Sequence, residues 1–361
     1  MQWKKQIRNL TPYKPGKPAA EVKKEFGLDN IVKLASNENP FGFSPKIDDW
    51  FKENGVNHAI YPDGYATKLR DSLAGFYHLQ PKQFIFGNGS DEIIQIISRA
   101  LLEPGKNTIM PVPTFPQYRH NAIIEGAEVI EIPLIKGEHD LKNMLTSINE
   151  QTAVLWLCSP NNPTGTYINN DDLRDFLNKV PSHVLIVLDE AYYEYVIAPD
   201  YYDAVALISE YPNLLVTRTF SKAYGLAGFR VGYGMASEEL IQTIEPVREP
   251  FNTNVLAQVS AEIAVSDQSF VSECRMANRK GLAQYYTFCD ELALEYYPSQ
   301  GNFILIDFKR DADELFRALL QQGFIVRSGQ ALGFPTSLRI TVGSTEQNSR
   351  IIEVLKELLQ Q

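Results

Sequence analysis

The chain has 361 residues, of which 44% are hydrophobic and 22% are charged, and its formal net charge is -10 at pH 7. The length predicts two domains, or one large domain with an addition, and the acidic balance argues against nucleic acid as a partner because phosphate backbones attract basic surfaces. No transmembrane segment is expected, since the longest apolar runs, such as Val184 to Leu188, have only the length of a strand.

The cysteines and the N-terminus indicate the compartment. Cys158, Cys274 and Cys289 lie far apart and form neither a disulfide framework nor a zinc pattern. None of the five histidines has a ligand spacing. The charges at the N-terminus are not followed by an apolar stretch, so no signal peptide is predicted. We therefore expect a cytoplasmic protein without a metal site.

Residues 1–35 are expected to form an N-terminal arm that joins the smaller domain. Pro12, Pro15 and Pro18 forbid a helix and favour an extended segment. A short helix is predicted from about Ala20 to Phe26, with Gly27 in a C-terminal capping position.

Residues 36–250 are expected to form the large domain. From about residue 60 to 250 strand-like and helix-like segments alternate, which is an α/β pattern. The predicted strands carry apolar residues at successive positions and suit a mostly parallel sheet flanked by helices and buried on both faces. They lie at 84–86, 108–110, 153–157, 184–188 and 214–216.

The pattern changes over residues 251–361, where we expect a smaller α+β domain. A long helical stretch runs toward Leu292, and a further helix is predicted near 313–321. Strands are predicted at 302–307, 324–326 and 338–342. The last helix opens with Ser344-Thr-Glu-Gln347, which fits a capping box.

Ligands of open α/β sheets lie beyond the carboxyl ends of the strands, and four predicted strand ends carry unusual residues. The first is Phe86-Gly-Asn-Gly-Ser-Asp-Glu, whose glycines and following helix start could bind an anion. The alternative is an ordinary turn in which Ser90 caps the helix. The second is Cys158-Ser-Pro-Asn-Asn-Pro-Thr-Gly, which offers fixed amide donors or is a plain loop.

The third strand end places Asp189 after a buried strand, where an unpaired carboxylate would be costly. A partner Mg²⁺ would indicate an ATPase, but the required Gly-x-x-x-x-Gly-Lys-Ser/Thr loop is missing: Lys106 is followed by Asn107, and Lys17 by Pro18. The protonated ring nitrogen of pyridoxal phosphate fits better as the cation.

The fourth strand end is the segment from Arg218 to Gly234, which contains Lys222. A lone lysine is usually solvated, but this one lies between a buried strand and a glycine-rich apolar stretch. A desolvated lysine has a lowered pKa and can form a Schiff base. Ser221 and Arg230 add an anion-binding pair.

Together these segments resemble the histidinol-phosphate aminotransferase family, within the aspartate-aminotransferase-like fold of pyridoxal-phosphate enzymes. The resemblance covers essentially the whole chain and rests on the order of its motifs. These are Lys33-Leu-Ala-Ser-Asn-Glu-Asn-Pro-Phe-Gly, Tyr61-Pro-Asp-Gly, Gly87-Asn-Gly-Ser-Asp-Glu, Pro160-Asn-Asn-Pro-Thr-Gly, Asp189-Glu-Ala-Tyr, Thr219-Phe-Ser-Lys-Ala-Tyr-Gly-Leu-Ala-Gly and Arg339-Ile-Thr-Val-Gly.

The resemblance implies a role for individual residues toward the cofactor, pyridoxal phosphate. The catalytic residues would be Lys222, Asp189 and Tyr192. Lys222 would carry the cofactor as a Schiff base and move protons, and Asp189 would pair with the ring nitrogen. The other cofactor contacts would come from Ser90, Asp91, Ser221 and Arg230 at the phosphate, Asn162 and Tyr192 at the phenolic oxygen, and Phe115 against the ring.

The resemblance also implies the partners. Tyr61 would reach the phosphate from a neighbouring subunit, which implies a homodimer. Arg339, Arg327 and Tyr13 would hold the anionic end of the substrate; for the arginines the alternative is a surface ion pair. The expected reaction moves an amino group between histidinol phosphate and 2-oxoglutarate, in histidine biosynthesis.

Other functions remain open at this point. The nearest alternative is an aromatic amino-acid aminotransferase, followed by a phosphothreonine decarboxylase of the same fold. Outside this cofactor class, a nucleotide-binding α/β protein and a non-catalytic binding protein are the rivals.

Overall fold

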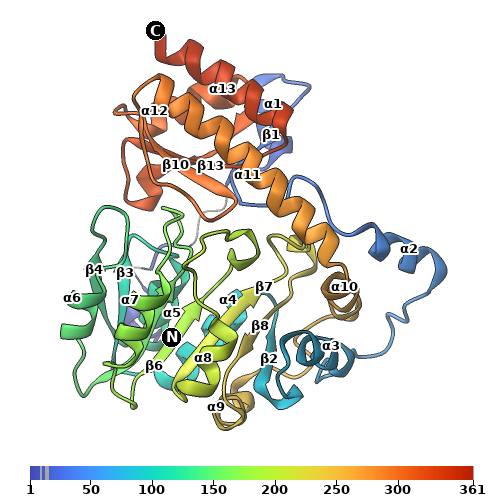
Figure 1. Cartoon of the computed structure of the whole chain (residues 1–361), viewed down its shortest axis with the longest axis vertical. Helices are drawn as coiled ribbons and strands as arrows, with labels where there is room; N and C mark the ends of the chain where they lie inside the picture. Colours follow the sequence, from blue (N-terminus) through green and yellow to red (C-terminus); the bar gives the residue numbers. More distant parts are fainter. Residues whose placement is uncertain (9, 13–15, 361) are drawn as a thin grey trace.

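A seven-stranded sheet forms the centre of the larger part of the chain in the computed structural model, which describes residues 1–8, 10–12 and 16–360 (Figure 1). The strand order is β2-β8-β7-β6-β5-β3-β4, and all neighbours are parallel except β8, which runs antiparallel to β2 and β7. The strands are β2 (Phe84–Gly87), β3 (Asn107–Val112), β4 (Glu128–Pro133), β5 (Thr152–Cys158), β6 (Leu185–Asp189), β7 (Leu214–Thr219) and β8 (Gly232–Met235).

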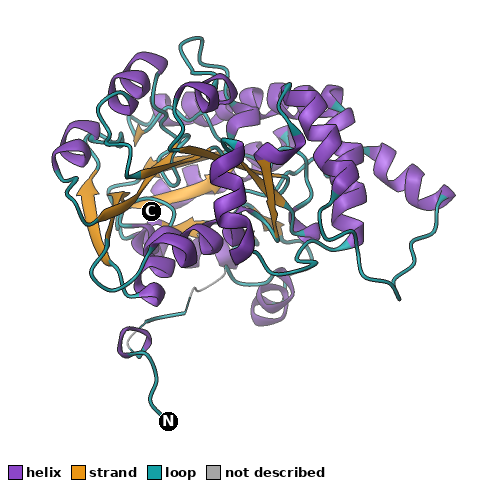
Figure 2. Cartoon of the chain, turned by 90° about the horizontal axis from the view of Figure 1, so that it is seen from below, coloured by secondary structure: helices purple, strands orange, loops and turns teal. Residues whose placement is uncertain are grey.

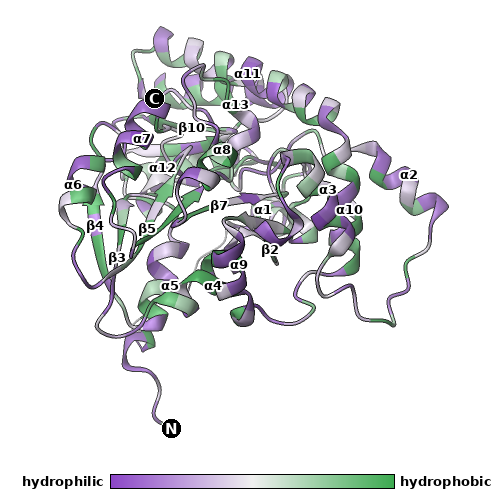
Figure 3. Cartoon of the chain, turned by 60° about the horizontal axis from the view of Figure 1, so that its bottom comes forward, coloured by the Kyte–Doolittle hydropathy of each residue, from purple (hydrophilic) through white to green (hydrophobic). Residues whose placement is uncertain are grey.

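The central strands are buried because both of their faces are apolar. Along β5, Leu155 and Leu157 pack into one core cluster, while Val154 and Trp156 pack into the cluster on the opposite face. Figure 3 shows hydrophobic colour along β5. The helices of this part are α2 (Pro45–Glu53), α3 (Thr67–Tyr77), α4 (Ser90–Leu101), α5 (Gln117–Glu125), α6 (Leu141–Thr146), α7 (Asn170–Leu177), α8 (Ala204–Glu210), α9 (Glu238–Ile244) and α10 (Val255–Ser266). The predicted α/β class and mostly parallel sheet are confirmed.

A smaller antiparallel sheet of order β12-β13-β10-β9 lies at the other end of the molecule, with α11 to α13 around it (Figure 1). Figure 2 shows helices around the strands of the molecule. Its strands are β9 (Glu295–Tyr296), β10 (Phe303–Asp307), β12 (Arg327–Ser328) and β13 (Ser337–Thr341), and its helices are α11 (Gln268–Glu291), α12 (Ala312–Gln321) and α13 (Thr345–Gln360). The capping box is present, since the Gln347 N–H donates to Ser344 Oγ at 3.2 Å and the Ser344 N–H donates to Gln347 Oε1 at 2.9 Å. None of the helices in the described ranges is both long and apolar enough to cross a bilayer.

The N-terminal segment joins this smaller sheet. α1 (Ala19–Phe26) ends at Gly27, which has a left-handed φ of 64° and caps the helix as predicted. β1 (Val32–Lys33) pairs in parallel with β11 (Phe324–Ile325), and Val22 packs against Ile325. The domain limits at residues 35 and 250 remain a prediction. Ala257 of α10 lies beyond the second limit and packs in the core of the large sheet.

Two strands of the large sheet were not predicted from sequence. β4 lies at the sheet edge and is mostly half-buried or exposed, so it lacks the continuous apolar run of its neighbours. β8 reads as a glycine-rich loop because backbone crowding dictates its composition: a Cβ on Gly232 would lie 2.4 Å from the Ser90 nitrogen.

A buried ion pair connects β6 to β7. Arg218 donates from Nε and Nη2 to Glu190 Oε2 at 2.9 and 2.7 Å, and the two side chains are 1% and 0% exposed. The guanidinium lies 3.5 Å from the ring centroid of Tyr193. These contacts compensate two charges within the core.

We expect Arg218→Met to lower the free energy of unfolding by about 3–5 kcal/mol, because Glu190 would keep a buried charge without its partner. Urea unfolding followed by circular dichroism measures the change. Arg174→Met is the matched control: its pair with Glu210 is exposed, so its unfolding midpoint should stay near that of the unaltered protein. Equal midpoints for the two variants would contradict the assignment.

Candidate functional site

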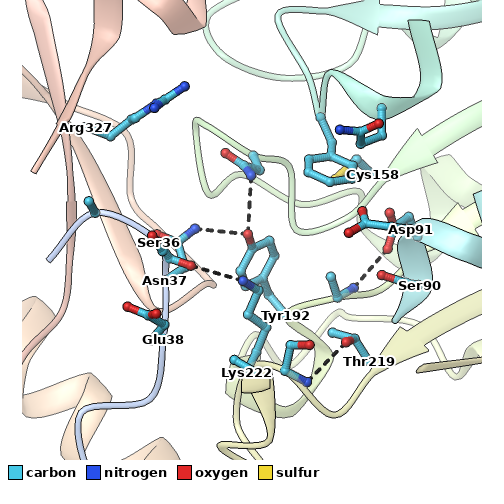
Figure 4. Close-up of a pocket in the computed structure, with 18 of the residues that line it drawn as sticks. Ser36, Asn37, Glu38, Ser90, Asp91, Cys158, Tyr192, Thr219, Lys222 and Arg327 are labelled. Carbon is cyan, nitrogen blue, oxygen red and sulfur yellow. Dashed lines mark hydrogen bonds between the residues drawn. The ribbon is translucent and has the colours of Figure 1, made fainter. Parts of the chain in front are cut away.

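A cavity of about 340 Å³ lies at the carboxyl ends of β5, β6 and β7, where the two parts of the chain meet (Figure 4). The large part contributes strand ends and the start of α4, and the small part contributes β12 and β13. The segment that connects β1 to α2 closes a further side. The residues used below that line the cavity are Asn37, Ser90, Asp91, Phe115, Cys158, Asn162, Asp189, Tyr192, Ser221, Lys222, Arg230, Arg327 and Arg339.

Lys222 follows β7 and projects its amine into this cavity. Its Nζ donates to the backbone oxygen of Ser36 at 3.2 Å. Burial, followed by the positive charge of Arg339, lowers the pKa of Lys222 to about 8. A substantial fraction of the amine is therefore neutral near physiological pH, which is the form that attacks a carbonyl or accepts a proton.

Asp189 ends β6 and is 2% exposed. Its Oδ2 accepts a hydrogen bond from the Tyr118 hydroxyl at 2.5 Å, and its Oδ1 accepts one from the Ala191 N–H at 3.2 Å. Burial raises the pKa of this carboxyl to about 6. In the described ranges no lysine or arginine forms an ion pair with Asp189. A bound cationic group would therefore offset the free-energy cost of burying this carboxylate in its ionised form.

Four of the predicted residues form an anion site around the start of α4. Arg230 Nη1 donates to Ser221 Oγ at 3.3 Å, and Arg230 Nη2 lies 3.4 Å from Asp91 Oδ2. Gly89 precedes the helix with a φ of 85°, and a Cβ there would lie 2.5 Å from Arg230 Nη2. Ser90 is the first residue of α4 rather than its cap, so the alternative in which it only caps the helix is wrong. Free helix N–H groups beside a guanidinium suit a phosphate.

Tyr192 lies at the centre of an amide network. Its hydroxyl accepts hydrogen bonds from Asn162 Nδ2 at 3.3 Å and from Asn37 Nδ2 at 3.0 Å. Asn37 was not assigned a role from sequence. It is 1% exposed and has a φ of 54°, and its backbone N–H donates to Thr341 Oγ1 in β13.

The two predicted substrate arginines are direct neighbours across β12 and β13. Arg327 and Arg339 are register partners, and both line the cavity. Arg339 is 7% exposed and donates to Asn162 Oδ1 at 2.6 Å and to the Ala35 backbone oxygen at 2.7 Å. Two guanidinium groups side by side at a cavity wall favour an anionic ligand.

The remaining predicted residues differ in position. Phe115 lines the cavity, with its ring edge-on to Tyr118 at a centroid distance of 5.6 Å. Tyr61 does not line the cavity of its own chain; it is 78% exposed and stacks on Phe251. Tyr13 lies outside the described residues.

Two residues of the site were missed from sequence. Asn37 stands in a quoted motif, but its left-handed backbone and its bonds to both parts of the chain have no sequence signal beyond a polar residue after a short strand. Tyr118 is the second residue of α5, whose N-cap is Pro116, and its sequence context indicates only an aromatic residue of the core.

The chain matches the family model described as aminotransferase class I and II over residues 29–355. It is 59% identical over 361 residues to the histidinol-phosphate aminotransferase of Geobacillus sp. (strain WCH70), covering 100% of this chain and 99% of that protein. It is 58% identical over 360 residues to the enzyme of the same name from Bacillus subtilis (strain 168), covering 99% of this chain and 100% of the relative.

The fold is also that of a solved enzyme. The structure of histidinol-phosphate aminotransferase from Sinorhizobium meliloti in complex with pyridoxal-5'-phosphate superposes with a TM-score of 0.90, at 24% identity, covering 99% of this chain and 98% of that chain. At this identity the likeness concerns the fold, and it confirms the predicted aspartate-aminotransferase-like architecture.

The residues of the cavity fit pyridoxal phosphate, which combines a phosphate, a carbonyl, a phenolic oxygen and a ring nitrogen. Arg230 and the start of α4 match the phosphate, and the Lys222 amine matches the carbonyl. Tyr192 suits the phenolic oxygen, while the buried Asp189 carboxylate has the charge to pair with a protonated ring nitrogen. The full-length likeness and this chemistry agree with each other and with the sequence prediction: the chain belongs to the histidinol-phosphate aminotransferase family and is a pyridoxal-phosphate-dependent aminotransferase of class I and II.

Proposed function

We propose that this enzyme transfers the amino group of histidinol phosphate to 2-oxoglutarate, a step of histidine biosynthesis, in the cytoplasm. The observation that carries the proposal is the adjacent pair Arg327 and Arg339 in the same cavity as Lys222. A phosphate gains more from two guanidinium groups than a single carboxylate does, and a dicarboxylate acceptor also offers two anionic groups. Relatives 58–59% identical over the full length carry the name of this activity.

In this proposal each predicted residue holds one part of the cofactor. Lys222 is the covalent attachment point, and Asp189 binds the ring nitrogen. Tyr192 and Asn162 bind the phenolic oxygen, and Phe115 packs against the ring. Ser90, Asp91, Ser221 and Arg230 surround the phosphate. When bound, pyridoxal phosphate supplies an electron sink for the bonds at the substrate's amino-bearing carbon.

The reaction then needs a mobile base, and Lys222 is the proposed one. Lys222 Nζ, which would hold the cofactor in the resting enzyme, would be the base that takes a proton from the substrate's amino-bearing carbon. Its lowered pKa of about 8 leaves enough neutral amine for this step. Burial is the main cause of the lowered pKa, so the cavity walls that exclude water also increase the neutral fraction of the Lys222 amine.

The substrate's anionic end is assigned to Arg327 and Arg339. Arg339 is fixed by its bonds to Asn162 and Ala35, and it would serve any anionic substrate. Arg327 is the residue that separates the proposed substrate from aromatic amino acids, since it adds a second guanidinium that a lone carboxylate does not require.

A second copy of the chain is proposed to complete the site. Tyr61 is 78% exposed and lies apart from its own cavity, between the similarly exposed Ile60 and Tyr65. An exposed cluster of large apolar side chains on a single chain is typical of an interface. We therefore propose a homodimer in which Tyr61 contacts the phosphate site of the partner subunit.

Lys222→Ala is expected to abolish transamination of histidinol phosphate while the protein stays folded, because the change removes both the attachment point and the proton carrier. The measurement is amino transfer to 2-oxoglutarate, with cofactor binding followed by visible absorbance. The control is Lys179→Ala, which alters an exposed lysine just after the end of α7 and should keep full activity. Near-normal turnover of Lys222→Ala without added amine would contradict the assignment.

Arg327→Ala is expected to lower kcat/KM for histidinol phosphate by about ten- to a hundredfold, the loss of one charge-assisted contact worth roughly 1.5–3 kcal/mol. The value for phenylalanine or tyrosine should fall much less. Arg310→Ala alters an arginine of the same part that bonds to the end of α13 and should leave both values unchanged. A wild type that prefers phenylalanine, or equal losses for both donors, would favour the aromatic aminotransferase instead.

Mixed subunits test the shared site. Lys222→Ala and Tyr61→Ala variants should each lose activity, but heterodimers made by mixing them should contain one site with both native residues and regain part of it. The measurement is activity after subunit exchange, with heterodimers quantified by differently tagged chains. If heterodimers form and activity does not return, Tyr61 acts within its own chain.

A further inference from the structure

Tyr118 occupies a position behind the cavity rather than in its wall. It lies in the first turn of α5, is 0% exposed, and is absent from the cavity lining. Its hydroxyl donates to Asp189 Oδ2 at 2.5 Å. The hydroxyl therefore acts on the site through Asp189, and it does not touch the cavity itself.

The ring of Tyr118 is held on two sides. It stacks on Trp156 with a centroid distance of 4.8 Å and an angle of 11°, and Phe115 meets it edge-on. Trp156 is fixed in turn, because its Nε1 donates to Thr108 Oγ1 at 2.8 Å, and Thr108 Oγ1 donates to the Val154 backbone oxygen at 2.8 Å. This chain of contacts anchors the hydroxyl to β3 and β5 and leaves the phenol little freedom to turn away.

The electrostatic surroundings give the hydrogen bond a direction. Burial and the negative charge of Asp189 raise the pKa of Tyr118 well above its ordinary value, so the phenol keeps its proton and acts as a donor. Around Asp189 the other titratable groups are the Cys158 thiol, the Tyr192 hydroxyl and the Asp91 carboxylate. Asp91 disfavours the ionised form of Asp189, whereas the donation from Tyr118 favours it.

We propose that Tyr118 is a positioning residue for the transamination: its hydroxyl fixes the Asp189 carboxylate and keeps it ionised, so that Asp189 holds the proton on the ring nitrogen of the cofactor. This proposal rests on the assignment of Asp189 to the ring nitrogen under the proposed function. Without the Tyr118 hydroxyl, the buried Asp189 carboxylate is a stronger base. The proton then moves from the ring nitrogen to Asp189, and both groups become uncharged. The ring then loses the positive charge that makes it an electron sink.

Tyr118→Phe tests this with a minimal change, since the ring can keep its stack on Trp156 while the hydroxyl is lost. We expect kcat to fall about tenfold, the effect of one charge-assisted hydrogen bond, with a smaller change in KM because no substrate contact is removed. The equilibrium dissociation constant of pyridoxal phosphate, measured by absorbance titration of the cofactor-free protein, should rise by a similar factor.

A cofactor analogue separates positioning from general loss of structure. In the analogue the ring nitrogen is replaced by carbon, so Asp189 has no proton to hold. Tyr118→Phe should bind this analogue as tightly as the wild type does, while it binds pyridoxal phosphate more weakly. Equal weakening for both molecules, or no weakening for either, would overturn the proposal.

Tyr285→Phe is the matched control, because Tyr285 is also fully buried and donates to Asn348 Oδ1 at 3.0 Å in the smaller part of the chain. It should bind both molecules like the wild type. Replacing Tyr118 by 3-fluorotyrosine gives a second, shape-preserving variant whose more acidic phenol should change the relative affinity for pyridoxal phosphate in the opposite direction. A change in the same direction would also overturn the proposal.

The outcome is independent of the substrate assignment. If the wild type bound pyridoxal phosphate but did not use histidinol phosphate, the proposed substrate would be wrong, and the binding comparison would still report on Tyr118. If Asp189→Asn bound both molecules with the affinity of the wild type, the ring-nitrogen assignment itself would fail, and the role of Tyr118 with it.

Discussion

At the end of β6 two consecutive carboxylates, those of Asp189 and Glu190, enter opposite faces of the large sheet, and each burial has to be compensated. Glu190 is compensated within the protein by Arg218 of the neighbouring strand. Among the described residues the donors to Asp189 are uncharged, and they include the Tyr118 hydroxyl and the backbone N–H of Ala191. One of the two carboxylates is therefore paired within the protein, whereas burial of the other would be compensated by a bound cationic group, which the proposed function assigns to the ring nitrogen of the cofactor.

The cavity is closed by residues that are distant in sequence. Asn37 donates to Tyr192 of the large part, and its backbone is bonded to Thr341 of the small part. Arg339, also from the small part, donates to Asn162. The proposed substrate arginine and the proposed cofactor contacts are therefore joined through amide side chains at the junction of the two sheets. A shift of the small part would disturb both groups at once.

Much of this arrangement follows from the sequence because its causes are local. Residues 153–157 of β5 and 185–188 of β6 are apolar at successive positions, which is typical of strands buried on both faces. Asp189 could be singled out because a carboxylate at the end of a buried strand needs a partner, and Lys222 because a lysine between a buried strand and a glycine-rich apolar stretch is rarely solvated. The proposed phosphate site could be singled out from the glycines before Ser90, and the structure shows that Gly89 lets the Arg230 guanidinium approach the start of α4, since a Cβ there would lie 2.5 Å from Arg230 Nη2.

The rest depends on packing that sequence patterns do not contain. A buried tyrosine is common, and the donation from Tyr118 to Asp189 depends on the stacking of the Tyr118 ring on Trp156 of the neighbouring strand β5, a contact that the sequence does not reveal. The left-handed backbone of Asn37 is set by its bonds to distant strands. Tyr61 is a different case, since the family likeness suggested a role that the single chain does not display: its ring lies on the surface against Phe251.

The electrostatics of the cavity connect substrate binding to the base. The chain carries a formal net charge of -10, yet Arg327 and Arg339 meet at the cavity wall, and Arg339 is the largest cause after burial that lowers the pKa of Lys222. An anion bound to Arg339 would offset part of this positive field at the lysine amine and so raise the affinity of Lys222 for a proton. Under the proposed function Lys222 would be a free amine only while substrate occupies the cavity, so an anionic end held at Arg339 would favour proton uptake when the base is needed. This coupling would require no movement of the chain, because Arg339 and Lys222 both line a single cavity.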